Sequence, residues 1–260
     1  MQVTRRKAYL EVLGIDRWVP RDALEPAAEA ALAIVAAAAP RAAGQITARA
    51  PAQAPAPAVI TPPLEPGIDW GPLRERVAGC TLCELCKTRT QTVFGVGNTR
   101  AEWLVIGEAP GAEEDRQGEP FVGRAGQLLN AMLLAIGLPR ETVFIANILK
   151  CRPPGNRDPK PEEVARCLPY LAAQIALLEP KIILAVGRIA AQNLLATDAP
   201  LARLRGKLHS FGAANTPLVV TYHPAYLLRT PADKRKAWED LKFARAAHTR
   251  ICGRVTGAGA

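Results

Sequence analysis

Four short apolar runs between residues 103 and 222 constrain the fold more than any other feature of the sequence. They are rich in residues that favour β-strands, and they are Trp103–Ile106, Val143–Ile148, Ile182–Val186 and Leu218–Tyr222. Helical patterns lie between or after these runs: Ala125–Ile136, Glu162–Leu178, Arg188–Leu195 and Lys234–Ala247. Apolar runs that alternate with helices are typical of a parallel sheet covered on both faces. We therefore expect an α/β fold, a three-layer α/β/α arrangement around a central, mostly parallel four-stranded sheet.

The composition changes sharply along the chain. Residues 1–22 carry apolar side chains at helical spacing, whereas residues 23–66 are rich in alanine and proline and contain no aromatic residue. Such a composition is typical of an extended, semi-rigid linker. We expect a docking peptide over residues 1–22, a linker over 23–66, one folded domain over 67–250 and a flexible tail over 251–260.

The charge balance of the 260-residue chain indicates its class of partner. The formal net charge is +9, which favours a polyanion, with nucleic acid ahead of a membrane surface. The sequence shows neither an apolar run of transmembrane length nor the pattern of a signal peptide. We expect a cytoplasmic, monomeric protein with no membrane association, in which cysteines are metal ligands or free thiols more often than disulfides.

The six cysteines are unevenly distributed. Three form a C-x-x-C-x-x-C run, two lie far downstream and one is near the C-terminus: Cys80, Cys83, Cys86, Cys151, Cys167 and Cys252. A C-x-x-C pair lets two thiolates reach one metal centre from a single turn, and two further ligands complete the site. The spacing leaves zinc, a [4Fe–4S] cluster and a set of unrelated thiols open. A bound metal centre would tie the segment before the first strand to the domain.

Polar and glycine-rich segments follow the predicted strands, at the edge where parallel sheets bind ligands. Gly107–Asp115 and Gly118–Gly126 let the backbone approach a planar ligand closely. Within the first segment, Glu108 is a candidate base or charge stabiliser. Neither a G-x-G-x-x-G nor a Walker pattern occurs, which disfavours a nucleotide-cofactor site and leaves an ordinary turn as the alternative.

Two later strand ends carry candidate recognition groups. Asn147 offers both a donor and an acceptor, as a nucleobase edge requires, although turn and cap roles are more common for asparagine. His223 is a candidate neutral donor or cation facing a developing anion, with a loop histidine as the alternative. The residues Leu227, Leu228 and Arg229 combine apolar wedges with a phosphate-binding cation, which suits a loop that unstacks a base.

Together these segments resemble the family 4, iron–sulfur, uracil-DNA glycosylases over roughly residues 70–245. The motifs that carry the resemblance occur in order: Cys80-x-x-Cys83, Gly107–Gly111, Pro120–Gly123, Asn147 with Lys150–Pro154, Cys167, and His223–Arg229. The resemblance implies a [4Fe–4S] cluster with four ligands, Cys80, Cys83, Cys151 and Cys167, and places Cys86 outside the ligand set.

The resemblance also implies an enzyme that flips uracil out of double- or single-stranded DNA and hydrolyses its N-glycosidic bond, leaving an abasic site. Phe121 would stack on uracil, Asn147 would bind its polar edge, and His223 would donate to O2 as charge builds there. Glu108 would position or activate water or stabilise the cationic sugar.

The backbone of Gly107 and Ala109 would assist Glu108 in substrate binding. Glu114 and Asp115 are secondary acidic candidates. The competing hypotheses are a non-catalytic, clamp-loader-associated or DNA-binding scaffold on the same fold and a zinc-stabilised nucleotide-binding module. The intact set of catalytic candidates argues against the scaffold, and the missing phosphate loop argues against the nucleotide-binding module.

The N-terminal segment departs from this compact pattern. Arg5–Trp18 resembles the N-terminal peptide of the psi subunit of the DNA polymerase III clamp loader. That resemblance implies that residues 1–22 dock on the clamp loader. The alternative is a helix that packs on its own domain.

Overall fold

The computed structural model describes residues 67–256. The expected docking peptide (residues 1–22), the expected linker (residues 23–66) and residues 257–260 lie outside the described part of the chain. The elements, core and sites below all belong to residues 67–256.

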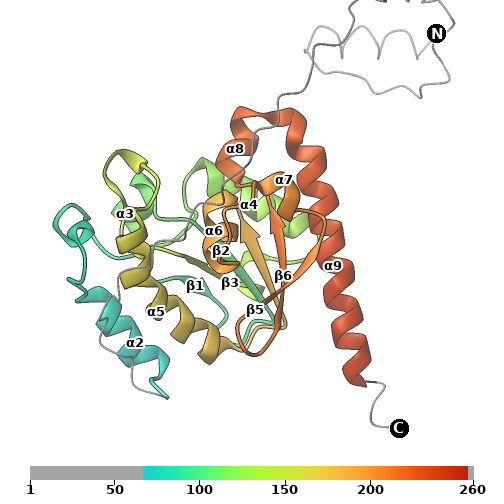
Figure 1. The fold of residues 1–260 in the computed structure, drawn as a ribbon, viewed down its shortest axis with the longest axis horizontal. Coiled ribbons are helices and arrows are strands. Elements are labelled where there is room, and N and C mark those ends of the chain that lie inside the picture. The colour runs from blue at the N-terminus through green and yellow to red at the C-terminus, as the bar shows by residue number, and fades with distance from the viewer. Residues whose placement is uncertain (1–66, 257–260) are drawn as a thin grey trace, which may run out of the picture. The chain divides into compact units, whose positions relative to one another are not determined.

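One six-stranded sheet forms the centre of this region (Figure 1). Its strands in chain order are β1 (Val96–Gly97), β2 (Trp103–Gly107), β3 (Phe144–Asn147), β4 (Ile182–Val186), β5 (Leu208–Phe211) and β6 (Thr216–Thr221). In space the order is β1-β3-β2-β4-β6-β5, and the four central strands are mutually parallel. The expected α/β class and the four parallel strands are confirmed.

The expected strand count is corrected from four to six, because two antiparallel edge strands extend the sheet. β1 pairs with β3 and is only two residues long, too short to leave a sequence pattern. β5 pairs with β6, and its residues alternate between exposed and half-buried positions rather than forming an apolar run. Edge strands as short as these leave few unpaired backbone groups, which limits pairing of the sheet with other chains.

The helices that flank the sheet have these bounds: α2 (Trp70–Ala78), α3 (Ala112–Gln117), α4 (Arg124–Ala135), α5 (Pro161–Leu178), α6 (Arg188–Leu194), α7 (Leu201–Leu204), α8 (Pro224–Arg229) and α9 (Lys234–Thr256). The ends of α4, α5 and α6 agree with the sequence prediction within one residue. α9 begins where predicted but continues to Thr256, so its helix includes the first residues of the segment expected as a tail.

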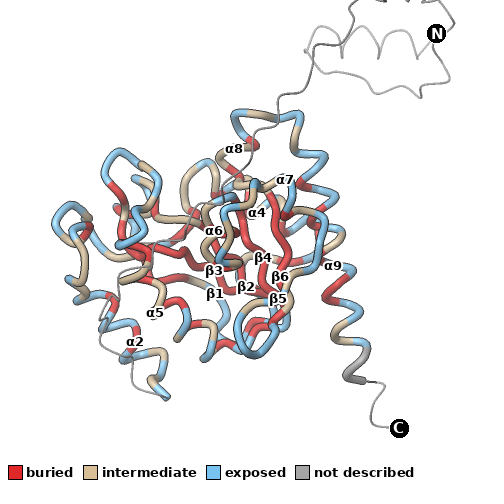
Figure 2. The backbone as a smooth tube through the Cα atoms, in the orientation of Figure 1, coloured by how far each residue is buried: buried red, intermediate tan, exposed pale blue. Residues whose placement is uncertain are grey.

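Side-chain alternation along the strands divides the core into two halves. Leu104 and Ile106 of β2 lie in the half that includes α2, α5 and α6. Trp103 and Val105 lie in the half that includes α4 and α9. All five residues of β2 are buried, as Figure 2 shows for the centre of the sheet. Burying one such side chain contributes about 1.5–3 kcal/mol, so the two-sided core holds the three layers together.

The register of the central strands brings their carboxyl ends to one edge. Gly107 at the end of β2 lies opposite Asn147 at the end of β3, and Val186 of β4 lies opposite Thr221 of β6. None of the helices within residues 67–256 combines the length and apolar character that a membrane-spanning helix requires.

Candidate active site

A cleft of about 400 Å³ opens at the carboxyl ends of the parallel strands. Its walls include Glu108 after β2, Asn147 at the end of β3, His223 after β6 and Phe121 from the loop between α3 and α4. The structure therefore brings together four side chains that are up to 115 positions apart in the sequence. Ala109 also lines the cleft, as the sequence predicts.

The Phe121 loop is held in a conformation that the residue does not favour on its own. Phe121 has a φ of 55°, in the left-handed region. Arg140 donates to the carbonyl oxygens of Pro120 (2.6 Å) and Phe121 (3.3 Å), and Glu114 accepts from the backbone N–H of Val122 (3.0 Å). A strained backbone persists only where its surroundings determine it, and it clusters at functional sites. The backbone that carries the Phe121 ring is thus held in place by these hydrogen bonds.

Gly107 allows two cleft side chains to approach one point on the backbone. A Cβ at this position would lie 2.5 Å from Asn147 Oδ1 and 2.6 Å from Phe121 Cζ. Both distances are far below van der Waals contact. The amide and the ring therefore share the space that a side chain at position 107 would fill.

Asn147 presents an unused acceptor to the cleft. Its side chain is buried, and Oδ1 has no hydrogen-bond partner within residues 67–256. Leaving a buried polar group unpaired costs about 1–3 kcal/mol, so such a group indicates a functional constraint. The backbone carbonyl of Asn147 accepts a hydrogen bond from Lys150 Nζ (2.9 Å), which fixes the strand end behind the amide.

His223 is a neutral histidine with a defined tautomer. Its Nδ1 accepts a hydrogen bond from the backbone N–H of Ala225 (3.2 Å), so the ring proton lies on Nε2. Burial, reinforced by the Arg229 guanidinium, lowers the pKa of His223 to about 4. The ring centroid lies 5.6 Å from that of Phe121. Nε2 is therefore a neutral donor beside the aromatic platform.

Glu108 is a half-buried carboxylate with a raised pKa. Burial raises its pKa to about 7, and the nearby Asp158 carboxylate adds to the shift while Arg188 opposes it. Arg188 and Asp158 form an ion pair of 2.7 Å. Asp158 lines the cleft but was missed by sequence reasoning, because its segment follows β3 at a distance and carries no strand-end signal.

The two secondary acidic candidates, Glu114 and Asp115, accept hydrogen bonds from the backbone of nearby loops. Glu114 Oε1 accepts from Val122 and Gly123, and Oε2 accepts from the backbone N–H of Gly111 (3.1 Å). Asp115 is buried and accepts from the backbone N–H of Thr90 (3.0 Å). Both carboxylates therefore hold loops, and Glu114 also lines the cleft.

The three residues expected to contact DNA differ in their exposure. Leu227 is only 1% exposed and packs in the core, so the expectation that its side chain reaches DNA is wrong. Leu228 is 37% exposed, and Arg229 lines the cleft. On a short helix, adjacent side chains point in different directions, and the sequence pattern alone does not tell which of two leucines faces outward.

A second cavity gathers the predicted metal ligands. Four cysteines line it, Cys80, Cys83, Cys151 and Cys167, and Cys86 is not among its lining residues in the described part of the chain. All six cysteines are free thiols. The donor set therefore matches the four-thiolate coordination of zinc or of a [4Fe–4S] cluster.

The environment of these thiols favours a cationic centre. Burial raises the pKa of Cys151 to about 11 and that of Cys167 to about 12, so thiolates here need a positive partner. The Arg89 guanidinium donates to Cys151 Sγ (3.1 Å), and the backbone N–H of Lys150 donates to Cys167 Sγ (3.2 Å). N–H···S hydrogen bonds of this type stabilise ligated sulfur and tune metal centres.

Comparison with known proteins agrees with this geometry. The chain belongs to the uracil DNA glycosylase superfamily, which matches residues 94–242. Within it, the chain is 45% identical over 172 residues to a type-4 uracil-DNA glycosylase of Archaeoglobus fulgidus, covering 64% of this chain and 86% of the relative. The type-4 enzyme of Pyrobaculum aerophilum is 43% identical over 180 residues (67% and 92%). That of Thermotoga maritima is 41% identical over 175 residues (66% and 91%).

The close packing of Gly126 against the Phe121 backbone predicts how a substitution there changes stability. A Cβ at Gly126 would lie 1.8 Å from the Phe121 carbonyl oxygen, so Gly126→Ala must displace the loop and should destabilise the protein by about 1–3 kcal/mol. Gly71, in α2, is the matched control, because a Cβ there meets nothing within 4 Å. Gly71→Ala should be neutral or stabilising by up to about 1 kcal/mol. Denaturant unfolding of both variants measures the difference, and equal stabilities would contradict the packing.

Proposed function

We propose that this protein is a uracil-DNA glycosylase that flips uracil out of DNA and hydrolyses its N-glycosidic bond, leaving an abasic site for base excision repair. The observation that carries the proposal is the convergence of an aromatic ring, an unpaired amide oxygen and a neutral imidazole N–H in one cleft. Membership of the superfamily and the similarity to type-4 enzymes support it.

Uracil is recognised by its polar edge. Asn147 Oδ1 accepts from uracil N3–H, and Nδ2 donates to O4. Cytosine presents the opposite pattern, because its N3 is an acceptor and its N4 carries hydrogens. The unpaired Oδ1 is satisfied by uracil and would stay buried without a partner against cytosine. Phe121 stacks on the base, and its fixed loop limits the entropy lost on binding.

The departing base is stabilised by His223. Cleavage of the glycosidic bond leaves negative charge on the uracil ring, and the Nε2–H of His223 donates to O2 as that charge develops. Because the imidazole is already neutral and oriented by Ala225, no reorganisation is needed during the reaction. Preorganised donors of this type are usually the largest single contribution to such catalysis.

Glu108 acts on the sugar side of the bond. As a carboxylate it stabilises the oxocarbenium-like sugar or positions the attacking water. The backbone of Gly107 and Ala109 supports the substrate beside it. Glu108 directly follows β2 and lies at the same edge of the sheet as Asn147 of β3. The acid–base group and the recognition group therefore act from neighbouring strands.

Leu228 and Arg229 contact DNA at the mouth of the cleft. The exposed Leu228 side chain enters the base stack, and Arg229 binds a phosphate. Flipping a base costs a few kcal/mol, and an apolar wedge offsets part of that cost. The net charge of +9 strengthens binding to either single- or double-stranded DNA.

Cys80, Cys83, Cys151 and Cys167 would hold a [4Fe–4S] cluster. When bound, it supplies a structural cross-link, since hydrolysis of a glycosidic bond requires no electron transfer. The four ligands join the segment after α2, the segment after β3 and helix α5. Such a cluster would therefore tie the segment before β1 to the part of the domain that carries Asn147.

Residues 1–22 dock the enzyme on the DNA polymerase III clamp loader. The proposal rests on the sequence of Arg5–Trp18 and on the alanine- and proline-rich residues 23–66 that separate it from the domain. A tether of this kind raises the local concentration of the enzyme near newly copied DNA. We place the protein in the cytoplasm as a monomer.

The catalytic assignment is tested by His223→Ala and Asn147→Ala. Loss of one preorganised donor should reduce the single-turnover rate of uracil excision by about 10²–10³-fold without changing the fold. His209→Ala is the control, because His209 lies on the edge strand β5, its ring hydrogen-bonds to the carbonyl oxygen of Leu204 in α7, and it is absent from the cleft lining in residues 67–256. A labelled uracil oligonucleotide with abasic-site cleavage provides the measurement. Near wild-type rates in both cleft variants would overturn the assignment.

The pH dependence of excision is set by Glu108. Its active form is the carboxylate, and its pKa is about 7, so the excision rate should fall about tenfold per pH unit below pH 7. Glu108→Gln should be slow and lack this fall. His223, with a pKa of about 4, stays neutral and should add no change above pH 5. Single-turnover rates between pH 5 and pH 9 test both statements, and an unchanged acid limb in Glu108→Gln would refute the role of this carboxylate.

The ligand set is tested by metal content. Cys151→Ala and Cys167→Ala should lose most of the iron, roughly four atoms per chain, together with the broad visible absorption. Cys86→Ala should keep both. Zinc in place of iron, or equal iron loss in all three variants, would contradict the assignment.

The docking proposal is tested with the full chain and with a chain that lacks residues 1–22. The full chain should retain clamp-loader subunits in a pull-down, and the shortened chain should retain none while excising uracil at the same rate. Equal retention by both chains would reject the docking proposal and leave the glycosylase proposal intact.

A further inference from the structure

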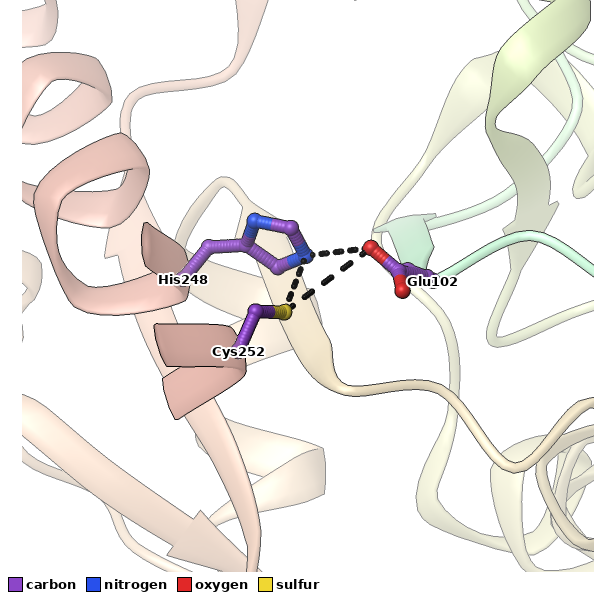
Figure 3. Close-up of side chains that lie close together, drawn as sticks. All are labelled: Glu102, His248 and Cys252. Carbon is purple, nitrogen blue, oxygen red and sulfur yellow. Dashed lines mark hydrogen bonds and ion pairs between the residues drawn. The ribbon is translucent and has the colours of Figure 1, made fainter. Parts of the chain in front are cut away.

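Three potential metal ligands meet far from the cleft and from the four clustered cysteines. Glu102 directly precedes β2, at the end of the sheet opposite the cleft, and His248 and Cys252 belong to α9 (Figure 3). The distances are 2.9 Å from His248 Nε2 to Glu102 Oε2, 3.4 Å from His248 Nε2 to Cys252 Sγ, and 3.9 Å from Cys252 Sγ to Glu102 Oε2.

Helix α9 and the residue before β2 bring the three side chains close together. His248 and Cys252 are four residues apart, so they lie on the same face of α9, one turn apart. The carbonyl oxygen of Glu102 accepts from the backbone N–H groups of Lys181 and Ile182, which anchors the third residue to the start of β4. The cluster thus links two layers of the fold.

The spacing agrees with a tetrahedral zinc site. Ligand distances of about 2.0–2.1 Å for nitrogen and oxygen and 2.3 Å for sulfur place tetrahedral ligand atoms roughly 3.3–3.6 Å apart. The three observed distances, 2.9, 3.4 and 3.9 Å, bracket that range, so adjustments of a few tenths of an ångström would centre an ion. A carboxylate, an imidazole and a thiolate are all established zinc ligands.

The surroundings favour an ordered site that remains open on one side. The His248 ring packs against Trp103, with centroids 5.1 Å apart, and its side chain is 11% exposed. The Glu102 side chain is 55% exposed. An ion can therefore enter from the Glu102 side, and water can fill the fourth position.

We propose that Glu102, His248 and Cys252 form a zinc-binding site that fastens the last turns of α9 to the start of β2. On binding, the Cys252 thiol releases its proton to solvent, and the His248 ring binds through Nε2 with its proton on Nδ1. The two anionic ligands balance the charge of Zn²⁺. The site is structural and independent of uracil excision. An ordinary Glu102–His248 hydrogen bond would explain two of the residues but gives no role to Cys252.

Zinc binding by the full, iron-loaded chain tests the proposal. After dialysis against Zn²⁺, iron and zinc are measured in the same sample, so that zinc bound to iron-depleted cysteine sites is recognised. The wild type should bind one zinc per chain in addition to its iron. His248→Ala and Cys252→Ala should weaken zinc binding by more than the roughly 10–100-fold that follows loss of an outer-shell partner.

Two further variants separate a metal site from a packing effect. Cys252→His supplies a different zinc ligand and should retain binding, whereas Cys86→Ala removes a cysteine outside the cluster and should bind as the wild type does. Zn²⁺ should raise the thermal unfolding midpoint of the wild type but not of Cys252→Ala, and all these variants should excise uracil at the wild-type rate. Absence of zinc from the wild type, or equal zinc in the wild type and Cys252→Ala, would overturn the proposal.

Discussion

The contact among Gly107, Asn147 and Phe121 is the constraint on which the cleft depends. The missing side chain at position 107 lets an amide oxygen and an aromatic ring approach the same backbone atom from two neighbouring segments. Parallel pairing of β2 and β3 places Gly107 opposite Asn147. The hydrogen bonds of Glu114 and Arg140 hold the loop that carries Phe121. The left-handed backbone of Phe121 and the unpaired Oδ1 of Asn147 both cost free energy, which the packing of the surrounding fold offsets. The resulting cleft suits a flat base with a hydrogen-bond donor on its edge.

Lys150 connects the cavity lined by the four cysteines to the cleft. Its backbone N–H donates to the sulfur of Cys167, and its buried ammonium donates to the carbonyl oxygen of Asn147 (2.9 Å) and to Gln174 (2.6 Å). Gln174 in turn donates to the carbonyl oxygen of Phe94 (2.9 Å). A metal centre bound by the cysteines would therefore influence the position of the Asn147 amide through one residue, Lys150, without any electron transfer.

Sequence reasoning succeeded where a residue's position depends on strand pairing. Asn147 and His223 stand at the ends of apolar runs, and parallel strands must bring those ends together. It failed where position depends on side-chain direction or on loop geometry. Nothing in the sequence pattern distinguishes buried Leu227 from exposed Leu228. The role of the Glu114 carboxylate in holding a loop depends on hydrogen bonds to residues eight and nine positions further along the chain. The cluster formed by Glu102 with His248 and Cys252 joins residues 146 and 150 positions apart, beyond the reach of any local motif.

In the proposed mechanism, selection of uracil over cytosine depends on the pairing of the base edge with Asn147, because O2, the acceptor assigned to His223, is present in both bases. This selection can be measured as the release of free base by the iron-loaded protein from two oligonucleotides that are identical except for uracil or cytosine at one position. We expect release of uracil, with an abasic site in the strand, and no release of cytosine. Equal release of both bases, or no release of uracil, would contradict this mechanism of selection.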